Sequence, residues 1–300
     1  MSEESTPGTA EQTAQQSAEP RTESHDPAVP EAYAAFMRTA WGERELDLPR
    51  HPVADHAARR RAALSEAFPG ERLVLPAGTY KVRSNDTDYR FRADTAHAYF
   101  CGNLTSDAVL VVEDGEGVLY ARPRSSRDTD EFFRDRQYGE LWAGRRPSLK
   151  EISDSLGLEV RHVDELAGRL DGGAKTRVHR GVSPAVDALV AGDSARDDGL
   201  VPGDTARDDE LARVASELRL VKDDWEGAEL QAACDATTLG FEDSVADWEN
   251  VLRHGERWLE GTFFRRARTM GNDIGYDSIV GGGRHATTLH WIENSGPITP

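Results

Sequence analysis

Histidine and cysteine are the residues here that could carry chemistry, and few of them stand at a spacing that defines a site. The chain has nine histidines and two cysteines. Cys101 and Cys234 lie far apart and form no Cys-x-x-Cys pair, which favours reduced cysteines in a cytoplasmic protein. His290 could move a proton, but no proton acceptor is in view near it, so a strand histidine with a satisfied ring is the competing interpretation. His285 lies in a glycine-rich loop and is expected to be exposed.

Carboxylates cluster in a short internal repeat. The heptapeptide GDSARDD at 192–198 recurs as GDTARDD at 203–209. It is too short and polar for a solenoid repeat, and it predicts a duplicated acidic linker. Calcium binding is the alternative, but the ligand spacing of an EF-hand loop is missing.

The charge balance restricts the partners. Lys and Arg total 36 and Asp and Glu total 54, a formal net charge of -18. Such a chain repels phosphate backbones, so neither nucleic acid nor an anionic membrane is expected to bind. No apolar run approaches the roughly 20 residues that span a bilayer, and the first 30 residues have no apolar signal core. These features predict a cytoplasmic protein.

Four regions are predicted along the chain. Residues 1–50 should form a disordered tail followed by a short amphipathic helix. Residues 51–190 should form an α/β domain, because strand-like and helix-like segments alternate. Strands are expected at 72–75, 98–101, 108–112, 117–121, 160–163 and 176–179, and helices at 56–68, 128–134, 148–156 and 164–170. Asp114-Gly115 predicts a hairpin, and Ser148 with Glu151 predicts a capping box.

The remaining regions are an acidic linker at 191–210 and a second domain at 211–300. One long helix or two are expected over 210–248. Extended segments should follow at 261–267 and 273–280, then a glycine loop at 281–283 and a last strand at 287–292. One or two helices and a few strands cannot cover a sheet on both faces, so this region is interpreted as the beginning of a domain.

Five segments in order resemble the aminopeptidase P family, the Xaa-Pro aminopeptidases of the creatinase and prolidase group. They are RSNDTDYRFR at 83–92, GELWAGRR at 139–146, RLVKDDWE at 219–226, GYDSIVGGG at 275–283 and TLHWIEN at 288–294. The resemblance covers nearly the whole folded chain. It implies a ribonuclease-H-like α/β domain of the creatinase N-terminal type, followed by the start of an α+β pita-bread domain.

The resemblance also implies a function. Full-length relatives remove the N-terminal residue ahead of proline with two divalent metals, usually Mn2+, which supply a hydroxide nucleophile. His290 matches a histidine that contacts substrate and helps proton movement. Trp142 matches a tryptophan that a neighbouring subunit lends to the active site, so a homo-oligomer is implied for the full-length protein. Its alternative is a core aromatic, and Arg145 and Arg146 beside it could position that interface or form ordinary ion pairs.

The sequence departs from the family at the metal ligands. Two Asp, one His and two Glu are expected downstream of the His290 segment, in D-A-G, H-G-x-G-H and E-P-G motifs, and none of these motifs is present in residues 1–300. Either the chain is a fragment of an Xaa-Pro aminopeptidase, or a truncated product that serves as a non-catalytic assembly or interaction module. A prolidase or creatinase relative is a third possibility. In each case the 300 residues alone are expected to be inactive.

Overall fold

The computed structural model describes residues 29–40, 45–171, 175–194 and 206–300. The predicted tail at 1–28 and the centre of the acidic linker, 195–205, lie outside the described residues. The elements of the first part are α1 (Glu31–Ala40), α2 (Val53–Glu66), β1 (Arg72–Pro76), β2 (Val82–Ser84), β3 (Thr87–Asp88), α3 (Thr95–Cys101), β4 (Val109–Glu113), β5 (Glu116–Ala121), α4 (Asp130–Arg134), α5 (Glu140–Ala143), α6 (Leu149–Leu156), β6 (Glu159–His162), η1 (Val163–Glu165), α7 (Leu166–Leu170), β7 (Thr176–Val178), α8 (Pro184–Ser194) and α9 (Ala206–Leu218).

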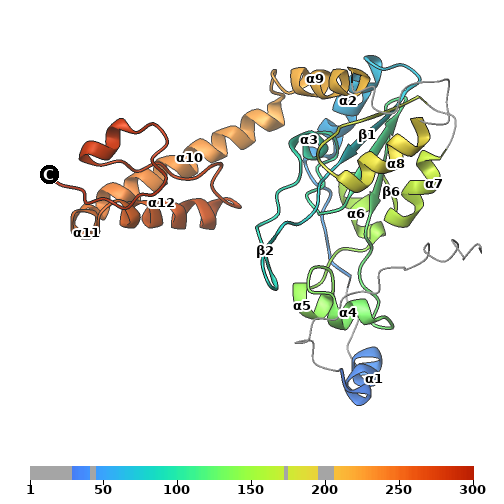
Figure 1. Ribbon diagram of the computed structural model, residues 1–300, viewed down its shortest axis with the longest axis horizontal. Coiled ribbons are helices and arrows are strands. Elements are labelled where there is room, and N and C mark those ends of the chain that lie inside the picture. The colour runs from blue at the N-terminus through green and yellow to red at the C-terminus, as the bar shows by residue number, and fades with distance from the viewer. Residues whose placement is uncertain (1–28, 41–44, 172–174, 195–205) are drawn as a thin grey trace, which may run out of the picture.

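The centre of this part is a mixed five-stranded sheet in the order β6-β5-β4-β1-β7 (Figure 1). β4 pairs antiparallel with both β1 and β5, whereas β7 and β6 add in parallel at the two edges. The turn between β4 and β5 is Asp114-Gly115, whose φ angles of 49° and 86° are those of a tight hairpin turn. The predicted hairpin is therefore confirmed.

Helices cover both faces of the sheet because successive strand residues point to opposite sides. Leu73, Leu75 and Leu110 face a core completed by α2, α3, α6 and α9. Val74 and Val109 face a second core closed by α7 and α8. Strands buried on both sides explain the continuously apolar sequence of β4.

Local signals explain where several helices begin. Ser148 and Glu151 form the predicted capping box at the start of α6. The segment 98–101, expected as a strand, instead belongs to α3, since Asp94 caps it through the N–H groups of Ala96 and His97. A short apolar run does not distinguish a buried strand from a buried helix, which is why the sequence misled here.

Two segments outside the sheet carry motif residues. β2 and β3 form an exposed two-stranded hairpin over the RSNDTDYRFR segment. The short helix α1 packs on α4 through Met37, Phe132 and Phe133. The predicted short helix thus docks on its own chain.

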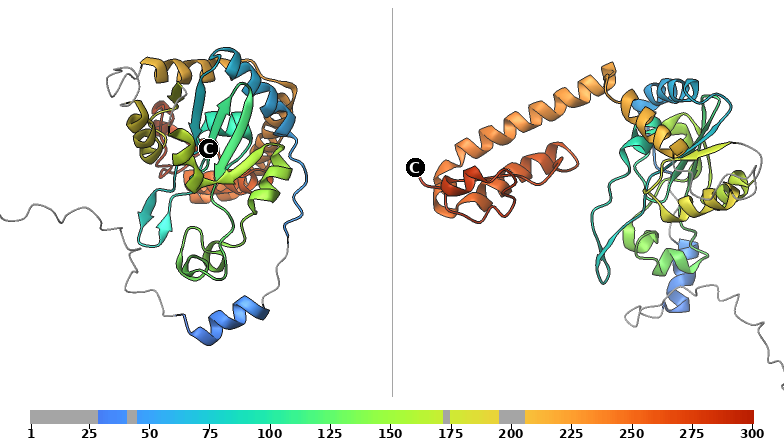
Figure 2. Two further views of the ribbon diagram at one scale, coloured as in Figure 1. Left: turned by 90° about the vertical axis from the view of Figure 1, so that its right-hand side faces the viewer. Right: turned by 45° about the horizontal axis from the view of Figure 1, so that its top comes forward.

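The second part projects from the sheet domain on one long helix (Figures 1 and 2). Its elements are α10 (Asp224–Ala246), α11 (Trp248–His254), α12 (Glu256–Met270) and the 3-10 turn η2 (Gly283–Thr287). α10 and α12 lie side by side, with Phe263 against Gly240 and Phe241. We refer to residues 224–300 as the C-terminal lobe.

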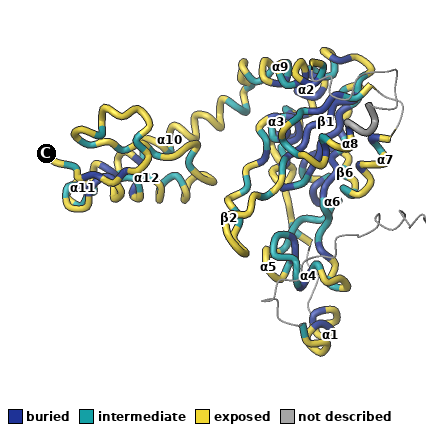
Figure 3. Tube along the Cα trace, viewed as in Figure 1, coloured by how far each residue is buried: buried dark blue, intermediate teal, exposed yellow. Residues whose placement is uncertain are grey.

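Three extended segments predicted for this lobe are wrong. Residues 261–267 are helical within α12, which packs along α10. Residues 273–280 and 287–292 are not strands, because among the described residues no strand of the lobe is available to pair with them. Most of the lobe is exposed or half-buried, in contrast to the sheet domain (Figure 3).

The domain limits stay a prediction, which the position of α9 helps to refine. Leu211 and Ala215 of α9 are buried in the core of the sheet domain. Two residues of the second acidic repeat also serve that domain, since Arg207 pairs with Glu71 and the carboxylate of Asp208 accepts from the Val178 N–H. We therefore propose that the sheet domain extends to Leu218, beyond the predicted limit at residue 190.

Candidate functional site

A buried carboxylate organises the segment that carries His290. Glu256, the first residue of α12, is 0% exposed. Its Oε1 accepts from the Gly282 N–H at 2.8 Å and lies 3.0 Å from Nδ1 of His285. Its Oε2 accepts from Nε1 of Trp291 at 2.8 Å and from the Gly296 N–H at 2.7 Å. One side chain thus contacts both ends of the stretch 282–296.

The environment keeps this carboxylate ionised. Burial alone would raise the pKa of Glu256, but the hydrogen bonds from Gly282, Trp291, Gly296 and His285 outweigh it and lower the pKa to about 2. The His285 ring also stacks on Trp291, with ring centroids 4.0 Å apart. His285, expected to be exposed, is therefore a largely buried member of this cluster.

Close approach of the backbone completes the arrangement. The Glu256 N–H donates to the Gly296 carbonyl at 3.0 Å, so both backbone polar groups of Gly296 are bound to Glu256. A Cβ on Gly296 would lie 2.4 Å from Nδ1 of His285, and only glycine fits there. Asn294, also fully buried, holds the same stretch by accepting from the Val280 N–H and donating to the Ser278 carbonyl.

His290 itself is exposed in the middle of this stretch. Its neighbour Leu289 is 88% exposed, and Ile292 is 51% exposed. Among the described residues the His290 ring has no hydrogen-bond or ion-pair partner, so its interpretation as a strand histidine with a satisfied ring is wrong. A free imidazole beside exposed apolar side chains is available for a ligand or for further polypeptide.

Trp142 lies on a different part of the molecule. It is on α5, is 46% exposed, and donates from Nε1 to the Phe133 carbonyl at 2.6 Å. It is therefore not a core aromatic. Arg146 makes an ordinary ion pair with Glu131 at 3.0 Å. α5 lies away from the C-terminal lobe in Figure 1 and in the right view of Figure 2, so a single copy does not bring Trp142 and His290 together.

A buried arginine joins the lobe to the sheet domain. Arg60 of α2 donates to Asp223 Oδ2 from both Nε (3.0 Å) and a terminal nitrogen (2.7 Å), and to the Tyr99 carbonyl at 3.0 Å. Asp223 in turn caps α10 through the Glu226 N–H. Burial would raise the pKa of Asp223, but the Glu226 N–H, Arg60 and His56 lower it to about 2. This joint sets the direction in which α10 leaves the domain.

The described residues do not fit the dinuclear metal site expected from the resemblance. No group of three or more His, Cys, Asp or Glu side chains converges within them. The best-placed pair, Glu256 and His285, is not a ligand set, because four donors occupy the two carboxylate oxygens.

No helix in the described part of the chain is long and apolar enough to span a bilayer.

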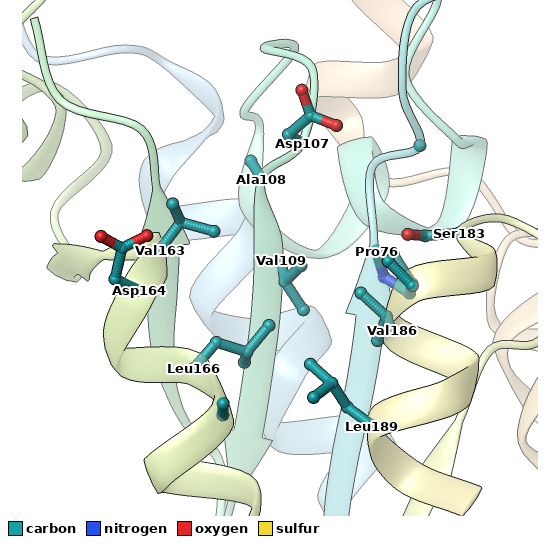
Figure 4. A pocket seen from close by; sticks show the side chains of 13 residues that line it. Pro76, Asp107, Ala108, Val109, Val163, Asp164, Leu166, Ser183, Val186 and Leu189 are labelled. Carbon is teal, nitrogen blue, oxygen red and sulfur yellow. The ribbon is translucent and has the colours of Figure 1, made fainter. Parts of the chain in front are cut away.

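A separate cavity of about 230 Å³ opens between α7 and α8 on the sheet domain (Figure 4). Its walls are mainly apolar, with Val109, Leu166 and Val186 inside and Asp107 and Asp164 at its margin. It contains neither His290 nor Trp142, and it lies on the sheet face opposite α9.

This chain is similar to known proteins in both sequence and structure. Residues 56–179 match the family model "Aminopeptidase P, N-terminal domain". The chain is similar to Xaa-Pro aminopeptidase 2 of Streptomyces coelicolor, with 45% identity over 91% of this chain and 57% of the relative. It is similarly related to Xaa-Pro aminopeptidase 1 of the same organism, with 46% identity over 91% of this chain and 55% of the relative. The chain thus spans little more than half the length of these curated relatives.

Two solved structures are similar to this chain. A variant of Escherichia coli aminopeptidase P in complex with substrate aligns with a TM-score of 0.67 and 25% identity, over 83% of this chain and 57% of that one. Pseudomonas aeruginosa aminopeptidase PepP gives 0.65 and 24%, over 84% and 57%, which bears on the fold alone. The predicted fold class, an α/β N-terminal domain followed by the start of a pita-bread domain, is confirmed.

Proposed function

We propose that this chain, an aminopeptidase P-type protein, forms the N-terminal portion of an Xaa-Pro aminopeptidase. The parent enzyme would hydrolyse the peptide bond between the first residue and a proline in second position. The observation that carries the proposal is 45% identity to a named Xaa-Pro aminopeptidase over 91% of this chain. Its substrates would be peptides, and nucleic acid and membranes would not be partners.

The surface of α10 supports the existence of further polypeptide in the parent. Leu230, Phe241 and Val245 are 52%, 63% and 72% exposed. Cys234 is also exposed on this helix. Apolar side chains in such number along one element are typical of a surface that another part of a protein covers.

The site residues take their proposed roles in that larger assembly. His290 would contact substrate and move a proton, which suits its exposed ring without an internal partner. Trp142 would serve the active site of a neighbouring subunit, which its exposure and its separation from His290 within one copy favour. We therefore propose a homo-oligomer for the full-length protein.

The metal ions would be bound outside the residues described here. Two divalent ions, proposed as Mn2+, would supply Lewis acidity and a nucleophile in the parent enzyme. We place their ligands downstream of residue 300, so that this chain alone is inactive. A cytoplasmic location is proposed from its two free cysteines.

A non-catalytic role is the alternative that one observation favours. No convergent ligand set exists in the described residues, so the chain as given could act as an assembly or interaction module. A prolidase or creatinase relative is a third candidate, which the sequences in the comparison favour less because those named are Xaa-Pro aminopeptidases.

The experiment that separates these functions begins with the intact mass of the protein in its native cell extract. A mass well above 33.0 kDa, with Mn2+-dependent cleavage of an Xaa-Pro peptide and none of its Xaa-Ala counterpart, is the expected result. A native mass of 33.0 kDa without cleavage would establish the non-catalytic alternative. Cleavage restricted to dipeptides would establish a prolidase.

A further inference from the structure

We propose that Glu256 is a positioning residue for His290: it closes the stretch 282–296 into a loop of fixed geometry and holds the imidazole at its centre. The assignment of a reaction to this loop rests on the proposed function. The positioning itself rests on the contacts of one side chain.

The Glu256 carboxylate binds both ends of the loop. Gly282 and Gly296 mark the two ends of the loop, and their N–H groups bind different oxygens of the Glu256 carboxylate at 2.8 and 2.7 Å. Trp291, directly after His290, donates to the same carboxylate at 2.8 Å. His290 is therefore one residue from a side chain whose position Glu256 determines.

The apolar side chains beside His290 do not hold this loop. A loop is usually held by burial of its apolar side chains, but in this loop Leu289 and Ile292 are 88% and 51% exposed. The buried groups are the polar side chains of Glu256 and Asn294, and the stacked His285–Trp291 pair beside them is half-buried. Directional hydrogen bonds, and not apolar contact, thus fix this backbone.

The carboxylate of Glu256 can accept more hydrogen bonds than a neutral side chain of the same volume. Isolated burial of a carboxylate is costly, and an apolar core of similar volume is often as stable as a buried ionic cluster. A carboxylate can accept from all four donors, whereas the amide of glutamine offers one oxygen and an NH2 group that cannot accept. Substituting Glu256 by Gln should therefore preserve volume while losing up to half of the acceptors.

The test in the 300-residue chain is an NMR comparison of Glu256→Gln with the unsubstituted protein. The Trp291 indole N–H and His290 ring signals, assigned with Trp291→Phe and His290→Gln, should both shift. Amide exchange at Gly282 and Gly296 should accelerate by about tenfold to a hundredfold. Unchanged His290 ring signals together with unchanged exchange would overturn the proposal.

Two further variants distinguish positioning from a general loss of structure. Glu260→Gln removes the same charge one turn later on α12, at a side chain without a hydrogen-bond or ion-pair partner in the described residues, and should alter none of these signals. Trp291→Phe removes one donor and should shift the His290 ring in its own right. If Glu256→Gln fails to fold, an unshifted His290 ring in Trp291→Phe would overturn the proposal.

A kinetic cycle in the native-length enzyme adds a readout that general destabilisation does not produce. Glu256→Gln should lower kcat at least tenfold in the native background but change the His290→Ala enzyme by less than twofold, because it acts through His290. Equal losses in both backgrounds would refute the positioning role. An enzyme without Xaa-Pro activity before substitution would refute the proposed function, and the NMR comparison would then decide the positioning role.

Discussion

The joint between the sheet domain and the C-terminal lobe should depend on the Arg60–Asp223 pair. The Arg60 side chain is 6% exposed and makes two hydrogen bonds to one carboxylate oxygen, one to the Tyr99 carbonyl, and a cation–π contact 4.1 Å from the Tyr99 ring centroid. Arg60→Ala removes all of these contacts at once. It leaves the Asp223 carboxylate with its backbone and His56 contacts only.

The expected magnitude follows from these contacts. Breaking a buried ion pair costs about 3–5 kcal/mol, and a hydrogen bond to a charged group contributes about 1.5–3 kcal/mol. The Asp223 side chain is 30% exposed, so water compensates part of the loss. We therefore expect Arg60→Ala to lower the free energy of unfolding by about 3 kcal/mol, and the Arg60–Asp223 coupling to be about 1.5–2 kcal/mol.

The assay is urea unfolding of four proteins: the unsubstituted chain, Arg60→Ala, Asp223→Ala and the double variant. Fluorescence of Trp225, whose ring lies 5.5 Å from the Arg60 guanidinium, would report on the joint, and circular dichroism would report on the whole chain. Arg213→Ala, an exposed arginine of α9 without an ion pair in the described residues, is the matched control. A coupling below about 0.5 kcal/mol, or an Arg60→Ala effect equal to that of the control, would refute the reasoning.

Three other predictions concern acid stability, helix packing and the core. The pKa of Glu151 is lowered to about 2, because hydrogen bonds from Ser148 and Leu46 and the charge of Arg124 outweigh the effect of burial. The contribution of Glu151 to stability is therefore complete above the ordinary pKa of 4.5 and is lost as the pH falls towards 2. Urea midpoints measured from pH 6 to pH 3 should fall less steeply for Glu151→Gln than for the unsubstituted chain, and equal slopes would contradict this. Gly240→Ala should weaken the α10–α12 contact, because the new Cβ would lie 2.8 Å from the Phe263 ring. Gly227→Ala, in open space on the same helix, should instead raise helix stability by up to about 1 kcal/mol. If thermal unfolding ranks the two variants in the opposite order, this packing is contradicted. Phe100→Ala should cost about 3–5 kcal/mol in urea unfolding, since the ring is completely buried, and a cost below about 1 kcal/mol would contradict its place in the core.

The sheet domain was largely predictable because its signals are local. Asp114-Gly115 sets the β4–β5 turn, and Ser148 with Glu151 caps α6, each within four residues of sequence. The failures share one cause. The segments 98–101 (AYFC) and 287–292 (TTLHWI) are short and rich in residues that favour strands, but their conformation depends on what packs against them, and the sequence alone does not contain that information.

Glu256 shows the same limit at the candidate site. In the sequence it is one acidic residue before Arg257 and belongs to none of the expected metal-ligand motifs. Its partners are 26 to 40 residues away, so no spacing rule connects them. His290 and Trp142 were instead proposed through resemblance, because their proposed roles concern a substrate and a second subunit, which one folded copy does not contain.

The two parts of the chain obtain their order from different physics, and this bears on how the site would be assembled. In the sheet domain, apolar side chains from both faces of the strands are buried within the chain itself. In the C-terminal lobe, the loop carrying His290 is held by Glu256 and Asn294 while Leu289 and Ile292 face outward. Hydrogen bonds of Glu256 and Asn294 fix this backbone within the chain itself, whereas the exposed apolar side chains would gain contacts only from further polypeptide. Under the proposed function, a lobe built in this way would present His290 in a defined position to the further polypeptide of the parent enzyme.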